Sequence, residues 1–302
     1  MYRKYLRIFS FFLSMMVVGF FFYNWNEISS VYNKINIYWA LTGFGCYVGN
    51  YIFRGIRLRI LTGSNIKFFS EAFHFSILHG FFSYLLPLRT GDVSLPVLLK
   101  ATGKINLKES VGVLVKMRII DFSMIGIFAI FGSLFGARMI SPTVQSLWLI
   151  SGILLTLFWF FFQKFGRISN YFFKKFNYEF DISALLKLNF IELFVSFLIW
   201  TSVYASQYCM IRSIGLDFKL SEVIFLSSIQ LPLQMLPVQG FANSGNHEGG
   251  WLASLVLMGF TAQESLKYAI ASHGVLVIYV ALLGLLAIMT GNRRIASFFE
   301  NL

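Results

Sequence analysis

Long apolar runs alternate with short polar segments along the whole chain. A helix needs about 20 apolar residues to cross the hydrocarbon core of a bilayer. Six runs fit that requirement, at about residues 5–23, 37–56, 111–135, 144–163, 186–211 and 265–290. The first run is followed by no small-residue cleavage site, which favours an uncleaved helix over a signal peptide. The pattern predicts an all-α polytopic membrane protein with about six transmembrane helices in a single integral membrane domain, residues 1–302.

Two other apolar stretches are interrupted near their middle. Residues 70–101 contain Pro87 and Gly91 with charged residues beside them, and residues 220–259 contain Pro237 and Gly240. Proline and glycine both disfavour the interior of a helix. We expect each stretch to form a re-entrant helical hairpin that returns to the side of the membrane from which it entered.

The two hairpin regions resemble each other in sequence. A Leu-Pro pair is followed in each by a Glu-Ser pair, and the position eight after the serine is Arg118 in one unit and His273 in the other. Three full spans separate the hairpins, so the units, about 68–135 and 220–290, would form an inverted repeat. Inverted repeats built around broken helices are typical of secondary transporters. Chance agreement of such short pairs in an apolar background is the alternative.

Basic residues between the runs indicate the orientation of the chain. With the N-terminus inside, seventeen Lys and Arg residues fall in cytoplasmic segments and five in outer segments. The inner set includes Arg54, Arg57 and Arg59. Because cytoplasmic loops are enriched in Lys and Arg, this predicts cytoplasmic N- and C-termini in a cell membrane. The basic, Phe-rich segment from Gly166 to Phe180 is expected to lie along the inner membrane surface.

Composition narrows the class of protein. Hydrophobic residues make up 57% of the chain and charged residues only 13%, too few to cover a soluble core of this size. The formal net charge of +12 comes from clusters between apolar runs, so a membrane, and not a nucleic acid, is the expected partner. Cys46 and Cys209 lie in apolar runs and are interpreted as inert buried thiols.

Charged residues inside the apolar stretches are the candidate functional residues. A charge at the centre of a spanning helix costs roughly 2.5–3.5 kcal/mol on insertion scales, so such residues are usually paired, hydrated or functional. They are Arg89 and Asp92 in the first break, Arg118 and Asp121 one turn apart on the third span, and Glu248 beside His247 in the second break.

These charges predict a polar cavity. Interrupted backbone at membrane depth is tolerated only where it faces protein or water, so two breaks imply such a cavity. Arginine is well suited to hold a phosphate there, since its planar fork donates two hydrogen bonds and stays charged. Alternatively, Arg89–Asp92 and Arg118–Asp121 are ion pairs that only hold the hairpins in place, or Arg118 snorkels to the interface.

No enzymatic chemistry is indicated by the remaining residues. His74 and His79 are five apart and lack a nearby carboxylate, so no metal site is expected. His273 is interpreted either as a proton carrier or as a hydrogen-bonded core histidine. There is no GxSxG motif, no Walker motif and no GxGxxG motif after a strand. We expect no cofactor and no enzymatic activity.

At these motifs the sequence resembles the flippase-like family related to the transmembrane part of lysylphosphatidylglycerol synthases. The resemblance covers most of the chain. It rests on the following matches: Pro87, Arg89, Gly91 and Asp92 in the first hairpin; Arg118 and Asp121 in the next helix; Arg57 near the end of the second span; and Pro237, Gly240, Gly245 and Glu248 in the second hairpin. Asp92 stands where the family commonly has Glu, and His273 where relatives often have Arg.

The resemblance implies movement of a phospholipid or a lipid-linked sugar, such as a polyprenyl-phosphate glycan, between leaflets. It assigns substrate binding to Arg57, Arg89, Asp92, Arg118, Asp121 and Glu248, with His247 and His273 beside them. The soluble aminoacyl-transferring domain of the synthases has no counterpart in this sequence, so aminoacylation by this chain is not expected. The alternatives are a membrane-embedded enzyme that modifies a lipid headgroup and an accessory subunit of a cell-envelope pathway. The sequence does not determine the oligomeric state, and a homo-oligomer is one alternative.

Overall fold

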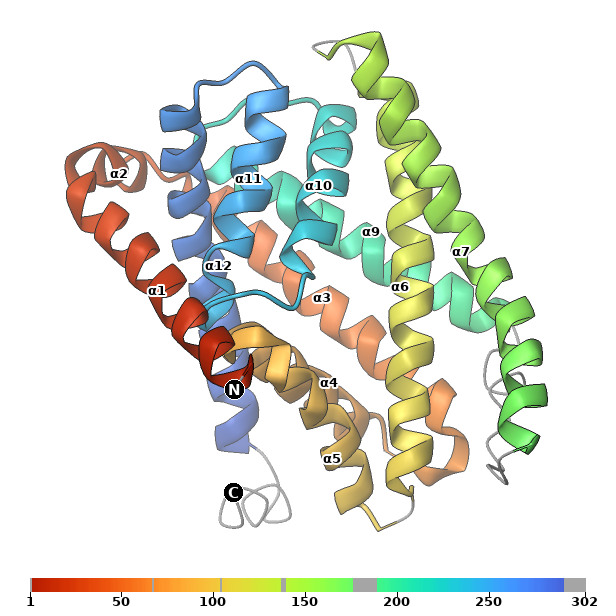
Figure 1. Ribbon diagram of the computed structural model, residues 1–302. Coiled ribbons are helices and arrows are strands. Elements are labelled where there is room, and N and C mark those ends of the chain that lie inside the picture. The colour runs from red at the N-terminus through yellow and green to blue at the C-terminus, as the bar shows by residue number, and fades with distance from the viewer. Residues whose placement is uncertain (1, 67, 104, 137–139, 176–188, 291–302) are drawn as a thin grey trace.

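The computed structural model describes residues 2–66, 68–103, 105–136, 140–175 and 189–290. Within these residues the chain forms eleven α-helices and three short 3₁₀ segments, and no strand (Figure 1). The all-α fold class is therefore confirmed for the described part of the chain.

Each of the six long apolar runs forms a helix. The helices are α1 (Tyr2–Tyr23), α3 (Ile37–Thr62), α6 (Leu107–Phe135), α7 (Pro142–Lys175), α9 (Phe190–Ser213) and α12 (Ala262–Thr290). Asparagine caps begin three of them, because the side-chain oxygens of Asn36, Asn106 and Asn189 accept hydrogen bonds from first-turn backbone N–H groups. An additional helix, α2 (Trp25–Tyr32), follows α1 at an angle of 79°.

The predicted count of six spans is not confirmed. By length and apolar composition, two of the described helices, α9 and α12, are able to cross a membrane, and α1 with α2 makes a third if the bent pair is one span. Tyrosine, asparagine and arginine side chains dilute the apolar character of α3. Residues 166–175 belong to α7, and 176–180 lie outside the described residues, so the predicted surface segment stays a prediction.

Apolar side chains nevertheless cover the outside of the bundle. Phe131, Leu134 and Phe135 of α6 are exposed, as are Leu285 and Met289 of α12. A soluble protein rarely exposes so many large apolar residues on adjacent turns, because each contact with water is unfavourable. The outer surface therefore fits a lipid environment.

Both interrupted stretches form a helix, a break and a second helix. The first consists of α4 (Phe69–Leu85), η2 (Pro87–Val93) and α5 (Ser94–Ala101). The second consists of α10 (Leu220–Gln234), η3 (Phe241–Asn243) and α11 (Asn246–Leu257). Each is followed by a long helix, α6 or α12, so the two units share the same order of elements.

The two helical hairpins approach each other tip to tip. In Figure 1 the chain enters α4 and leaves α5 at the lower end of the molecule, whereas it enters α10 and leaves α11 at the upper end. The breaks meet near the middle, where the backbone N–H of Leu88 donates to the carbonyl of Gln239 at 2.9 Å. Helix α1 contacts both breaks from the side.

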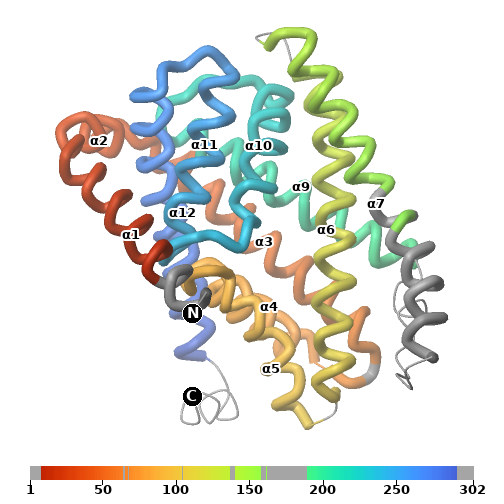
Figure 2. The backbone as a smooth tube through the Cα atoms, in the orientation of Figure 1, coloured from red at the N-terminus to blue at the C-terminus, as the bar shows by residue number. Residues whose placement is uncertain are grey.

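Four long helices support the hairpins. Helix α3 packs along α9, and α6 packs along α7 (Figure 2). One apolar core surrounds the first hairpin and includes Leu78, Leu95 and Leu99, and another surrounds the second and includes Phe225 and Trp251. Each hairpin is therefore packed into protein on its helical part, while its break faces the centre of the molecule.

Candidate functional site

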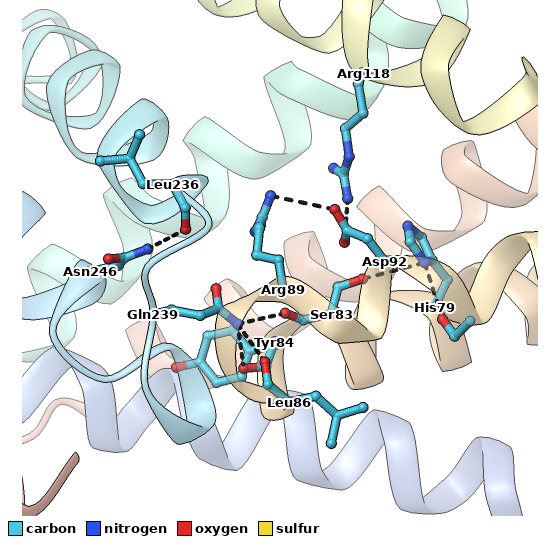
Figure 3. A network of polar contacts seen from close by, with 11 residues as sticks. His79, Ser83, Tyr84, Leu86, Arg89, Asp92, Arg118, Leu236, Gln239 and Asn246 are labelled. Atoms are coloured by element: carbon cyan, nitrogen blue, oxygen red, sulfur yellow. Dashed lines mark hydrogen bonds and ion pairs between the residues drawn. The ribbon is translucent and has the colours of Figure 1, made fainter. Parts of the chain in front are cut away.

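The first break places Arg89 at the centre of the fold. Leu88 and Arg89 both have left-handed backbone conformations, with φ of 56° and 53°. Such conformations are uncommon for residues with side chains and often occur at functional sites. Gly91 allows the break to fold back, because a Cβ atom at this position would overlap the carbonyl group of Phe82 in α4. The conformation turns the side chain of Arg89 inward (Figure 3).

Gln239 joins the two breaks. Its amide nitrogen donates to the carbonyl oxygens of Ser83 and Leu86 at 2.9 and 2.8 Å, and its side chain is fully buried (Figure 3). These carbonyls lie at the end of α4, where no helical partner is available to them. The second hairpin thus supplies the hydrogen bonds that the first hairpin loses at its break.

A cavity of about 180 Å³ lies beside this junction. By the same measure, one water needs roughly 10–15 Å³, so the cavity has room for on the order of ten waters or for a small polar group. Its walls come from α3, α4, α6, α9, α10, α12 and both breaks. The cavity that the two breaks predict is therefore present where they meet.

Three arginine side chains line the cavity: Arg54, Arg89 and Arg118. Arg118 donates to Asp92 at 2.7 Å, and Arg89 lies 4.0 Å from the same carboxylate (Figure 3). Arg54 contacts only the neutral Asn50 among the described hydrogen-bond partners, through its Nε atom at 2.6 Å. Asp92 is therefore shared by two guanidinium groups and, among the described residues, Arg54 has no carboxylate within ion-pair distance, so the three arginines carry two positive charges more than Asp92 balances.

A second ion pair closes one side of the cavity. Arg57 is fully buried and donates from Nη1 and Nη2 to the two oxygens of Asp121 at 2.6 and 3.3 Å. Trp200 Nε1 donates to the same carboxylate at 3.0 Å. Asp121 lines the cavity, but Arg57 neutralises its charge. A cationic ligand would therefore find no uncompensated carboxylate on this side.

This pairing corrects two expectations from the sequence. Arg118 and Asp121 do not pair with each other, although they are one turn apart on α6; Arg118 turns to the first hairpin and Asp121 to α3. Arg118 also does not snorkel to an interface, because it lines the central cavity. Arg89 and Asp92, which the sequence also suggests as an ion pair, are 4.0 Å apart.

Glu248, His247 and His273 lie at the second break, outside the residues that line the cavity. Glu248 accepts a hydrogen bond from the backbone N–H of Gly245 at 2.6 Å and contacts His273 Nδ1. The other ring nitrogen of His273 lies 2.7 Å from the carbonyl oxygen of Ala242, and His247 stacks on the His273 ring. Together they hold the second break, with Tyr84 between His273 and the cavity. Substrate binding by these three residues stays a prediction.

Arg54 is the main residue that sequence reasoning missed. The sequence places it with Arg57 among the basic residues on the cytoplasmic side and singles out only Arg57 as a site residue, whereas in the structure Arg54 lines the cavity and Arg57 is buried beside it. The spacing of Asn50, Arg54 and Arg57 gives one polar face on an otherwise apolar helix, and that pattern was the available signal. The amides of Gln207 and Gln234, which also line the cavity, had no distinguishing pattern.

Metal ligands do not come together in the described part of the chain, where no three His, Cys, Asp or Glu residues form a group suited to an ion. His79 lines the cavity and contacts the hydroxyls of Ser83 and Ser94 through Nδ1, at 3.3 Å each. The polar groups of the site are thus donors and neutral amides gathered around arginines, an arrangement suited to holding an anion.

Comparison with known proteins identifies one related family. The sequence model of the lysylphosphatidylglycerol synthase TM region matches residues 7–284, which include every residue of the cavity. No curated protein and no solved structure matches the chain.

Proposed function

Because the chain belongs to the family of lysylphosphatidylglycerol synthase transmembrane regions, we propose that it is a flippase-like transporter of phosphate-bearing lipids. Membership of this family makes it a multi-pass helical membrane protein. The proposed substrate is a phospholipid or a polyprenyl-phosphate-linked glycan, which moves between leaflets without chemical change.

The observation that carries this proposal is the set of three arginines around one cavity at the junction of two broken helices. Guanidinium groups bind phosphate oxygens through paired, charge-assisted hydrogen bonds, each worth about 1.5–3 kcal/mol. Keeping two uncompensated positive charges inside an apolar bundle is costly unless an anion or water shares the site. A lipid phosphate satisfies that requirement while its tails remain in the bilayer.

The arrangement of the hairpins supports an alternating-access mechanism. Their outer ends lie at opposite ends of the molecule and their tips meet at the cavity (Figure 1). In the proposed mechanism the two units are inverted repeats, the hairpins are re-entrant, and rocking of one unit against the other exposes the cavity to each leaflet in turn. Both termini face the cytoplasm in this scheme, as the basic residues between the apolar runs predict.

A translocation assay tests the proposal. Purified protein is reconstituted in vesicles with a fluorescent anionic phospholipid, and movement between leaflets is followed by chemical quenching of the outer leaflet. We expect Arg89→Gln to slow translocation about 10-fold or more, because it removes one charge-assisted contact to the phosphate. Asp92 keeps its partner Arg118 in this variant, so the fold is preserved.

The matched control is Arg59→Gln, which removes the same charge from an exposed position on α3 that does not line the central cavity. It should translocate lipid as the wild type does. Equal rates for the wild type and Arg89→Gln would contradict the proposal, as would recovery of a chemically altered lipid, which would favour a headgroup-modifying enzyme.

A further inference from the structure

His273 of α12 faces an oxygen acceptor with each of its two ring nitrogens. Nδ1 contacts Oε1 of Glu248 in α11, and Nε2 lies 2.7 Å from the carbonyl oxygen of Ala242 in the second break. Because a carbonyl oxygen only accepts hydrogen bonds, Nε2 carries a hydrogen. The contact between Nδ1 and the carboxyl group needs one more hydrogen, bonded either to Nδ1 or to Oε1. Glu248 and His273 therefore share a proton in this conformation.

His247, which stacks on His273, has a different protonation state. Its Nε2 atom lies 2.9 Å from Oγ of Ser272, and that hydroxyl donates to the carbonyl oxygen of Ala269 at 2.8 Å, so Nε2 is the donor to Ser272. Nδ1 is buried and has no hydrogen-bond partner among the described residues. A neutral ring with its hydrogen on Nε2 satisfies both observations. The ring centroids are 4.7 Å apart, so a charge on His247 would also repel a charge on His273.

Uncharged side chains face the pair from the neighbouring helices. Tyr84 of α4 presents its ring nearly at right angles to His273, with centroids 6.2 Å apart, and His247 of α11 stacks on the same ring. Tyr32 of α2 donates to a backbone carbonyl of α12 one turn away. Glu248 and His273 are only 4% and 7% exposed, so water is largely excluded from their contact. The pair balances its own charge here, because it consists either of two neutral groups or of a carboxylate and an imidazolium.

Loss of the shared proton would break the polar link between α11 and α12. Without that proton, a carboxylate oxygen faces the lone pair of Nδ1, and both atoms are acceptors. The pair would also carry a buried negative charge without a counter-charge, which is strongly unfavourable. Glu248 keeps its hydrogen bond from the backbone N–H of Gly245, and His273 keeps the one to Ala242. The proton therefore controls the contact between the two helices and leaves their other hydrogen bonds in place.

The second break connects this pair to the arginine of the first break. Gln239 lies three positions before Ala242, and its side chain donates to two carbonyl oxygens at the end of α4 (Figure 3). Its own carbonyl accepts from the backbone N–H of Leu88, the residue before Arg89. Coupling between two sites is carried by contiguous contacts of this kind. Movement of the second break is thus transmitted to Arg89 in the cavity.

We propose that Glu248 and His273 form a proton-binding site and that loading of this site is coupled to movement of lipid through the cavity. In the loaded state α11 is linked to α12, as in this structure. On release, the bond from the shared hydrogen to Nδ1 or Oε1 breaks, the proton passes to water, and a carboxylate and a neutral histidine remain. The second hairpin then moves against α12 and carries its junction with the first hairpin along.

The coupling acts in both directions. Because binding equilibria are reciprocal, lipid in the cavity changes the proton affinity of the site by the same factor as the proton changes the affinity for lipid. The coupling rests on the proposed function, whereas the proton site itself does not.

Nuclear magnetic resonance of the purified full-length protein in detergent tests the proton site. Histidine is isotope-labelled at its ring nitrogens, and His273→Gln and His247→Gln assign the two sets of signals. We expect the His273 ring to change its protonation with a single midpoint between about pH 5 and 9, where histidines in proteins commonly titrate. His247 should remain neutral, with its hydrogen on Nε2, over the same range.

Lipid translocation tests the coupling. Vesicles hold a fluorescent phosphatidylglycerol, whose phosphodiester keeps one negative charge over this range, and both sides are set to the same pH. We expect the wild-type rate to change at least about 5-fold across the range, the size of a typical coupling, with the midpoint found for His273. His273→Gln and Glu248→Gln should each make the rate nearly independent of pH, and thermal unfolding checks that both variants are folded.

Two other histidines serve as matched controls. His79 lines the cavity, and His74 contacts Ser70 and Thr290 away from both breaks. His79→Gln and His74→Gln should keep the pH dependence of the wild type, since neither change removes the shared proton.

The outcomes separate the two proposals. The proton coupling is wrong, while lipid transport stands, if the His273 ring keeps one protonation state throughout the range or if the wild-type rate does not change with pH. Loss of the pH dependence in His79→Gln but not in His273→Gln would have the same meaning. If the wild type moves no lipid at any pH, the proposed function is wrong and the coupling with it, and the resonance titration still decides whether the proton site exists.

Discussion

At the residue scale, two of the Arg–Asp pairs lie in opposite environments. Arg57 and Asp121 are almost completely buried, with side-chain exposures of 0% and 2%, whereas Arg212 pairs with Asp217, whose side chain is 87% exposed. Burial makes an unpaired charge very costly, because water no longer solvates it. The same chemical pair should therefore differ greatly in its effect on stability.

We expect Arg57→Ala to lower the free energy of unfolding by about 3–5 kcal/mol, because Asp121 is left buried without its counter-charge. Arg212→Ala should lower it by less than about 1 kcal/mol, since water replaces an exposed partner. Chemical unfolding in detergent, followed by tryptophan fluorescence, measures both. Similar small losses would show that Arg57 and Asp121 are hydrated, contrary to their burial in the structure.

At the same scale, the arginines that share Asp92 differ in how tightly they are paired. Arg118 is held by Asp92, and Arg89 remains close to that carboxylate without a direct short contact. Nε of Arg89 has no hydrogen-bond partner among the described residues. Arg89 is thus better placed than Arg118 to bind an incoming anion without first breaking a short ion pair.

At the element scale, each hairpin depends on close packing at its break. Gly91 lies directly against the backbone of Phe82 and Ser83, so that η2 folds onto the end of α4. Gly45, on the exposed side of α3, has no heavy atom within 4 Å of the position that a Cβ would take. A side chain larger than hydrogen is therefore excluded by packing at Gly91 and not at Gly45.

Gly91→Ala should destabilise the protein by about 1–3 kcal/mol or more, because the added methyl group forces the break away from α4. Gly45→Ala should be neutral or stabilise it by up to about 1 kcal/mol through helix propensity. Thermal unfolding in detergent compares the two. A stable Gly91→Ala protein that still binds phosphatidylglycerol would mean that the break is not folded against α4 as the structure has it.

At the scale of the whole molecule, the topology is the main open prediction. If both hairpins are re-entrant, the residues before α4 and after α5 face one side of the membrane, and those before α10 and after α11 face the other. Single cysteines at Ser70, Lys100, Asp217 and Gln263 sample these four places in a background with Cys46 and Cys209 replaced by alanine.

We expect a membrane-impermeant thiol reagent to label Asp217→Cys and Gln263→Cys in intact cells. Ser70→Cys and Lys100→Cys should be labelled only after the membrane is permeabilised, since the positive-inside rule places them in the cytoplasm. Labelling of Ser70→Cys and Lys100→Cys from opposite sides would show that the first hairpin crosses the bilayer, and the inverted repeat would then be excluded.

The sequence by itself determined where the long helices and the two breaks lie. Apolar periodicity and proline act over a few residues, because helical hydrogen bonds join positions four apart. For that reason the runs at 37–56 and 111–135, and the breaks at Pro87 and Pro237, are found close to where the pattern predicts them. The resemblance to the family likewise needed only short motifs, and the match over residues 7–284 confirms it.

Only the tertiary structure decided which side chains meet. Arg57 and Asp121 are 64 positions apart, and Arg118 and Asp92 are 26 apart. Their pairing depends on how α3, α6 and the first hairpin rotate and pack against one another, and no local pattern contains that information. The same packing places Arg54 on the wall of the cavity. It also places Glu248 against His273, at a position that does not line the cavity. Long-range packing, which helix propensity and spacing do not specify, therefore determined the composition of the site.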